Sequence, residues 1–171
     1  MKKPIALSSV VLLFIWLLPF VCTGEQEWAS ADNQLAQSDG IAARVFIAAQ
    51  SSKFKDALLA NITTSLDSQS VSYEVAEVSA LKMIDEEDYE AVVIIQYVKA
   101  GRINSHVRRF LDRTQSMNKI VLVTTAGSGN PKTDAWDIDT ITSASKMDEL
   151  VEITEKVLSR LEALLKISLS T

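Results

Sequence analysis

The chain has 171 residues, 47% of them hydrophobic and 23% charged, which is the composition of a globular protein with one core and not of a disordered or fibrous chain. Its 22 acidic residues outnumber its 17 Lys and Arg residues, and the net charge of −5 argues against nucleic acid as the main ligand. The single cysteine, Cys22, and the single histidine, His106, exclude an internal disulfide, a thiol-ligated metal and a multi-histidine metal site.

The N-terminal segment has the pattern of an export signal. Two lysines precede a predominantly apolar run over residues 5–21, and fairly small residues follow it. We expect a signal peptide over residues 1–24 with cleavage after Gly24, or alternatively after Ala31. Lipidation of Cys22 and an uncleaved anchor are further alternatives, and either would tie the protein to a membrane. The predicted location is exported, either periplasmic or associated with the cell envelope of a bacterium.

Residues 25–42 are polar and predict a linker, so we expect the folded domain over residues 43–171. Its first element is the apolar run Arg44–Ala49, which predicts a strand buried on both faces. From Ser52 to about Ser68 the apolar residues recur every four positions, and this spacing predicts an amphipathic helix.

The middle of the domain contains further strands and a second helix. Val71–Val75 alternates apolar and polar residues, as an edge strand does, whereas Ala91–Ile95 and Ile120–Val123 are apolar runs typical of buried strands. The stretch Met83–Tyr89, between Val71–Val75 and Ala91–Ile95, is acidic and short. Between the two buried strands, the apolar residues from Ile103 to Leu111 mark an amphipathic helix.

The last strand is predicted at Ile138–Ile141, and a long helix with one apolar face follows from Lys146. Ser145 and Asp148 have the spacing of a capping box at the start of this helix. Only about a dozen residues, Ala126–Asp137, join the last two strands, so a loop crossover without a helix is expected there.

Strands that alternate with helices predict a parallel sheet covered on both faces. Ligands of such sheets bind beyond the C-terminal ends of the strands, where the strand order reverses. The segments expected to form a binding site are therefore Gln50–Lys53, Gln96–Arg102 and Thr124–Asn130.

The stretch Tyr89–Ile103, followed by His106–Leu111, resembles the third strand, the flavin-facing loop and the next helix of flavodoxins and of protoporphyrinogen-oxidase-like relatives. The resemblance extends from the first strand to the final helix. It implies an α/β fold of the flavodoxin-like class, a doubly wound, parallel five-stranded sheet in a three-layer αβα arrangement.

The resemblance also implies where FMN would bind. Its phosphate would be held by Ser51, Ser52 and Lys53. The flavin ring would be surrounded by Tyr97, Lys99, Gly101, Thr125, Gly127 and Ser128. The phosphate segment of this chain departs from the family pattern because it has no glycine, and a helix N-cap explains Ser51 or Ser52 without any ligand. No catalytic residue and no metal site is assigned.

Other functions of this topology are excluded or left without support. A phosphoacceptor receiver domain needs carboxylates where Gln50 and Gln96 stand. A serine hydrolase needs a histidine late in the chain, whereas His106 opens a helix in mid-chain. The local cluster of arginines from Arg102 to Arg113 is interpreted as an exposed helix face.

Two functional hypotheses follow. The first is an exported flavodoxin-fold module with a non-catalytic binding or structural role, whose partner is an unknown envelope component or small molecule. The alternative is an FMN-dependent electron-transfer protein or reductase. Whether the protein is an enzyme stays open at this level.

Overall fold

The computed structural model describes residues 43–126 and 136–169. These residues belong to one compact unit, Gln37–Thr171. Five parallel strands form one sheet in the order β2-β1-β3-β4-β5. This is the strand order of the flavodoxin-like doubly wound fold, so the predicted fold class is confirmed. The strands are β1 (Arg44–Ala49), β2 (Ser72–Glu77), β3 (Ala91–Tyr97), β4 (Ile120–Thr125) and β5 (Thr140–Ser143).

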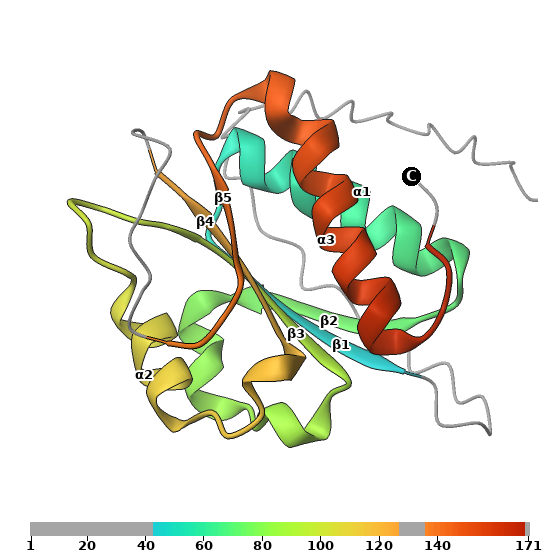
Figure 1. Cartoon of the computed structure of the whole chain (residues 1–171), viewed down its shortest axis with the longest axis horizontal. Coiled ribbons are helices and arrows are strands. Elements are labelled where there is room, and N and C mark those ends of the chain that lie inside the picture. The colour runs from blue at the N-terminus through green and yellow to red at the C-terminus, as the bar shows by residue number, and fades with distance from the viewer. Residues whose placement is uncertain (1–42, 127–135, 170–171) are drawn as a thin grey trace, which may run out of the picture. The chain divides into compact units, whose positions relative to one another are not determined.

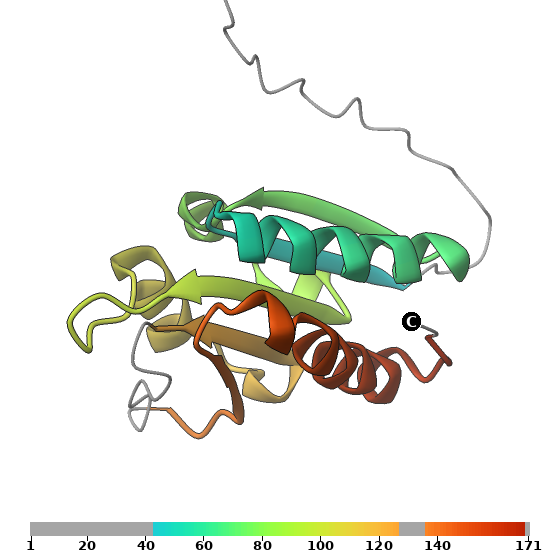
Figure 2. The same ribbon diagram turned by 90° about the horizontal axis from the view of Figure 1, so that it is seen from above.

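Helices cover both faces of the sheet (Figures 1 and 2). α1 (Lys53–Ser68) and α3 (Leu150–Leu165) lie on one face. α2 (Ser105–Arg113) lies on the other face, together with two short 3-10 helices, η1 (Val78–Met83) and η2 (Glu86–Asp88). The three-layer αβα arrangement is therefore confirmed.

The central strands are buried on both sides, as their uninterrupted apolar sequences predict. Val45 and Ile47 of β1 pack in the core beneath α1 and α3, whereas Phe46 and Ala48 pack in the core beneath α2. This alternation follows from the two-residue period of a strand, and it gives the domain one hydrophobic core on each face of the sheet. β2 lies at the edge of the sheet, as its alternating sequence predicts.

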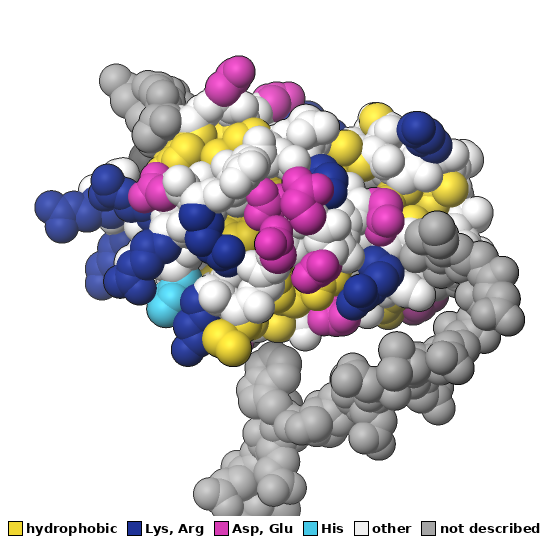
Figure 3. Space-filling model, turned by 90° about the horizontal axis from the view of Figure 1, so that it is seen from below, with side chains coloured by type: hydrophobic (Ala, Val, Ile, Leu, Met, Phe, Trp, Pro, Cys, Tyr) yellow, Lys and Arg dark blue, Asp and Glu magenta, His cyan; other side chains and the backbone are white. Residues whose placement is uncertain are grey.

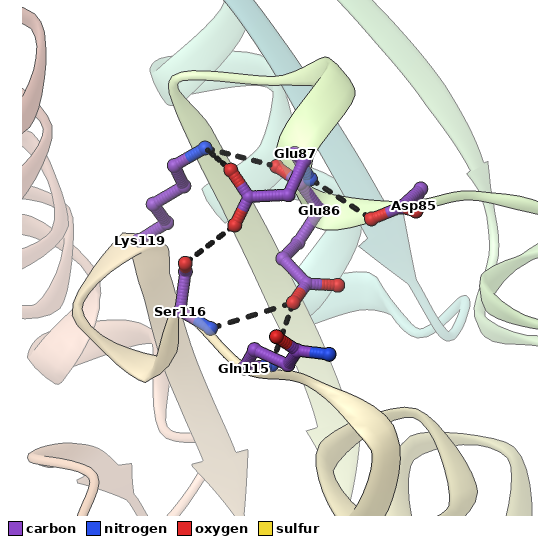
Figure 4. A network of polar contacts seen from close by, with 6 residues as sticks. All are labelled: Asp85, Glu86, Glu87, Gln115, Ser116 and Lys119. Atoms are coloured by element: carbon purple, nitrogen blue, oxygen red, sulfur yellow. Dashed lines mark hydrogen bonds and ion pairs between the residues drawn. The ribbon is translucent and has the colours of Figure 1, made fainter.

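The connection between β2 and β3 contains η1 and η2 in place of a long helix. Glu86 is only 4% exposed, and its Oε1 accepts the N–H groups of Gln115 (2.7 Å) and Ser116 (3.4 Å). Glu87 instead accepts hydrogen bonds from Ser116 Oγ and Lys119 Nζ (Figure 4). This network fastens the β2–β3 connection to the turn between α2 and β4.

The start of α3 differs from the prediction. The capping box of Ser145 and Asp148 is wrong, because Ser145 has a φ of +62° and its N–H donates to Ser143 Oγ (2.9 Å). The Ser143 hydroxyl in turn donates to Glu149 Oε2 (2.7 Å). The chain first makes a 3-10 turn, and α3 begins at Leu150, later than predicted.

The last strand is also shifted along the chain. β5 begins at Thr140, opposite Leu122, rather than at Ile138. Ile138 N–H donates to Trp136 O (2.8 Å), and the Ile138 side chain packs against the core beneath α2. Ile138 is apolar and lies just outside the paired residues of β5, so it was wrongly predicted to begin the strand. Most of the predicted loop crossover, residues 127–135, lies outside the described residues.

No helix within residues 43–126 and 136–169 is long and apolar enough to cross a membrane.

Candidate functional site

The C-terminal ends of β1, β3 and β4 meet at one edge of the sheet (Figure 1). Hydrogen bonds join the three ends: Gln50 N–H donates to Ile95 O (3.0 Å), and Gln50 Oε1 accepts the Tyr97 N–H (2.7 Å). Val98 N–H donates to Thr125 O (2.8 Å). The strand order reverses between β1 and β3, which makes this edge the expected ligand site of the fold. We define the C-terminal edge as residues 50–53, 96–102 and 124–126.

The segment between β1 and α1 is closed by its own side chains. Ser52 is the N-cap of α1, and its Oγ accepts the Lys55 N–H (3.4 Å). The Ser51 hydroxyl donates to Asp56 Oδ2 (3.2 Å), and this carboxylate belongs to the first turn of the helix, where it interacts favourably with the helix dipole. Both hydroxyls predicted to hold a phosphate therefore already have partners, and Lys53 is exposed.

Lys55 is a buried cation beside the C-terminal edge, and it is not among the site residues predicted from the sequence. The residue is 5% exposed, and its Nζ lies 5.8 Å from the centroid of the Tyr97 ring. Burial lowers the pKa of Lys55 because the charged form loses solvation, and Asp56 acts in the opposite direction. Tyr97 itself is 44% exposed, so its ring lies between a buried cation and solvent.

β3 leads into a two-residue hairpin turn. Lys99 N–H donates to Arg102 O (3.2 Å), and Arg102 N–H donates to Lys99 O (2.9 Å). The two central residues have left-handed backbones, with φ of +50° at Ala100 and +71° at Gly101. Gly101 adopts this conformation freely, whereas it costs an alanine about 1 kcal/mol. The hairpin therefore presents two basic side chains next to each other from a defined backbone.

Two polar side chains are fully buried where β3 and β4 end. Gln96 and Thr124 lie opposite each other in the register of the two strands, and both are 0% exposed. Gln96 Oε1 accepts the Asn104 N–H (3.1 Å). Within the described residues, Gln96 Nε2 and Thr124 Oγ1 have no hydrogen-bond partner. The sequence signal for this pair is a polar residue near the end of each otherwise apolar strand.

The structure brings the first group of predicted residues, Ser51, Ser52 and Lys53, to the same edge as Tyr97. The predicted Thr125 is also there, but it is 0% exposed and its hydroxyl donates to Gln96 O (3.2 Å). Lys99 and Gly101 are part of the hairpin, whereas Gly127 and Ser128 lie outside the described residues.

A hollow of about 270 Å³ lies farther along the same edge of the parallel sheet, between the C-terminal end of β5 and the first turns of α3. Its polar walls are already paired: Ser143 Oγ donates to Glu149 Oε2 (2.7 Å), and Lys156 Nζ lies 2.6 Å from Glu152 Oε1. In the part of the chain that the structure describes, no three His, Cys, Asp or Glu residues are grouped as metal ligands. The C-terminal edge is therefore the better candidate site.

No protein-family model matches the chain, and no curated protein matches it. The chain is similar in structure to a flavodoxin from the domain Archaea, with 14% identity, a TM-score of 0.48, and coverage of 71% of this chain and 98% of that one. It is also similar to oxidised Flavodoxin 2 from Bacillus cereus, with 13% identity, a TM-score of 0.49, and coverage of 71% and 99%. An NAD(P)H:quinone oxidoreductase from Methanothermobacter marburgensis is 13% identical, with a TM-score of 0.42 and coverage of 73% and 96%.

Proposed function

We propose that the domain is an exported binding module of flavodoxin-like fold that works without a bound flavin. The observation that carries this proposal is the closed segment between β1 and α1. The Ser51 hydroxyl donates to the carboxylate of Asp56, and the Ser52 hydroxyl oxygen caps α1 by accepting the Lys55 N–H. The C-terminal edge then serves to bind a partner.

A phosphate dianion fits this segment poorly. It needs free hydroxyl or N–H donors and close approach of the backbone, which glycines usually permit. The sequence has no glycine between Gly40 and Gly101. The carboxylate of Asp56 would repel the phosphate, because like charges at short range oppose each other. The same residues that stabilise the start of α1 therefore argue against a phosphate there.

Export also supports a module without flavin. Residues 1–24 have the pattern of a signal peptide, and the basic pair before the apolar run is Lys2 and Lys3, which is not the arginine pair that directs export of folded proteins. A flavin would have to be acquired outside the cytoplasm. We therefore place the protein in the periplasm or cell envelope as part of the same proposal.

A second candidate function, FMN-dependent electron transfer or reduction, is favoured by one observation. Tyr97 exposes 44% of its surface at the C-terminal edge, where an aromatic ring can stack on a planar ligand. In that case Ser51, Ser52 and Lys53 would hold the phosphate, and the flavin would supply the redox chemistry.

The two candidates are distinguished by the visible absorbance of the purified protein and by titration with FMN. We expect no flavin absorbance and no binding at about 100 μM FMN, which means a binding free energy weaker than about 5.5 kcal/mol. A matched variant, Asp56→Asn, removes the repelling carboxylate while keeping the size of the side chain. Stoichiometric FMN in the native protein would contradict the proposal, whereas weak binding that appears only in Asp56→Asn would support the physical reason given for it.

A further inference from the structure

The C-terminal edge carries a cluster of basic side chains in an otherwise acidic protein. From Ala91 to Leu111 the sequence contains four Lys or Arg residues and no Asp or Glu, although the net charge of the whole chain is −5. We define the basic patch as the exposed residues Lys99, Arg102 and Arg109 together with Tyr97.

The basic patch is not neutralised by the protein itself. Arg108 lies 3.7 Å from Asp112, but in the described residues no ion pair involves Lys99, Arg102 or Arg109. On the face of the molecule drawn in Figure 3, Lys and Arg side chains gather around the histidine at one end, whereas acidic side chains lie over the middle. The charge of this end is therefore available to a partner.

The backbone of the basic patch is well defined. Lys99 and Arg102 are directly opposite each other in the hairpin, where two like charges repel and destabilise the turn. Asn104 caps α2 by accepting the His106 N–H (2.8 Å), and Gln96 holds the Asn104 N–H. The first turns of α2, and with them Arg109, are thereby fixed to the C-terminal edge. An anionic partner would relieve the repulsion with little loss of backbone entropy.

The composition of the basic patch favours a protein partner. Exposed tyrosine and arginine residues are enriched at protein interfaces and among their energetic hot spots. Tyr97 is 44% exposed and one side of its ring faces Lys55, so it offers an apolar surface beside the charges. A duplex or a membrane would extend beyond this small surface and meet the acidic remainder of the molecule, where repulsion opposes binding. A small acidic patch on a protein meets only the complementary charges.

We propose that the basic patch binds an acidic polypeptide surface, with Lys99, Arg102 and Arg109 pairing with carboxylates and Tyr97 packing between them. This inference rests on the proposed function, because it names the class of partner that the binding module takes. Electrostatic attraction would mainly speed association, and the packing of Tyr97 would slow dissociation.

The test is calorimetric titration of the purified full chain with a capped deca-glutamate peptide at low salt. Binding is expected, and it should weaken as NaCl is raised from about 50 to about 200 mM because the charges are exposed. The variant Lys99→Glu/Arg102→Glu should bind about tenfold or more weakly. A control variant, Lys82→Glu/Lys146→Glu, changes the net charge equally at exposed lysines outside the basic patch and should bind like the native protein.

A Lys99→Gln/Arg102→Gln variant checks the result with a milder change, and circular dichroism verifies the fold of each variant. Tyr97→Ala should weaken binding severalfold without changing its salt dependence.

Absence of peptide binding would overturn the proposal, as would equal losses in the control variant. Preferential binding of a DNA duplex or of phosphatidylglycerol vesicles would overturn it in favour of a general polyanion site. Self-association that the patch variant abolishes, without peptide binding, would identify a second copy of the chain as the occupant. FMN titration of the same samples is independent, so failure of this inference and failure of the proposed function are distinguishable.

Discussion

Two neighbouring threonines at the end of β4 have the same burial but different hydrogen bonds. Thr124 and Thr125 are both 0% exposed, yet only Thr125 donates its hydroxyl to a carbonyl, that of Gln96 (3.2 Å). We expect Thr124→Val to stabilise the protein by about 1 kcal/mol, because a methyl group replaces an unpaired buried hydroxyl of similar shape. The measurement is the free energy of unfolding in urea.

The matched control for this prediction is Thr125→Val. This substitution has the same size change at the same depth, but it removes a hydrogen bond and leaves the Gln96 carbonyl with one partner fewer. It should destabilise the protein by about 1 kcal/mol. A loss of stability in both variants would mean that Thr124 Oγ1 has a partner, such as a bound water.

At the scale of elements, Glu86 and Glu87 are adjacent carboxylates with different roles in the β2–β3 connection (Figure 4). Glu86 is buried and accepts two backbone N–H groups from the α2–β4 turn, whereas the Glu87 side chain is 58% exposed. We expect Glu86→Ala to destabilise the fold by about 1–3 kcal/mol, because it removes the buried acceptor of two partly buried backbone N–H groups. Thermal unfolding followed by circular dichroism measures the effect.

Glu87→Ala is the control for Glu86. Hydrogen bonds from Ser116 and Lys119 to the Glu87 carboxylate lower the pKa of Glu87, but these bonds lie at the surface and are screened by water. The loss of stability should therefore be clearly smaller than for Glu86→Ala. Equal losses in the two variants would show that the network acts as one unit and not through the buried carboxylate alone.

At the scale of the whole molecule, two tyrosines are expected to make the free energy of unfolding depend on pH in the alkaline range. Burial is the main cause that raises the pKa of Tyr73 and Tyr89 above the ordinary value of 10.0. Because the folded state favours the neutral phenol, this contribution is complete below pH 10 and is lost as the pH rises through the folded pKa values. The free energy of unfolding should therefore fall above about pH 10.

The double variant Tyr73→Phe/Tyr89→Phe checks this pH dependence, since phenylalanine cannot ionise. The fall in stability between pH 9 and pH 11 should become shallower than in the native protein, whatever the change in absolute stability at neutral pH. An unchanged slope in the double variant would assign the alkaline transition to other groups.

The sequence by itself determined the sheet and most of its covering layers. Periodicity is a local property, so the apolar runs of β1, β3 and β4 and the four-residue spacing of α1 predicted these elements closely. The edge position of β2 followed from its alternation in the same way. The resemblance carried by Tyr89–Ile103 added the flavodoxin-like class of the sheet, and the structure confirms this class.

Only the tertiary structure decided the chemistry of the C-terminal edge. Lys55 lies in the first turn of α1, and only the tertiary structure shows that it is buried, with its Nζ near the ring of Tyr97 from β3. The hydrogen bond of Ser143, at the end of β5, to Glu149, in the 3-10 turn before α3, stands where the capping box was predicted. Such contacts depend on how separate elements pack, and the free energy of burying a polar group is set by that packing rather than by the neighbouring sequence.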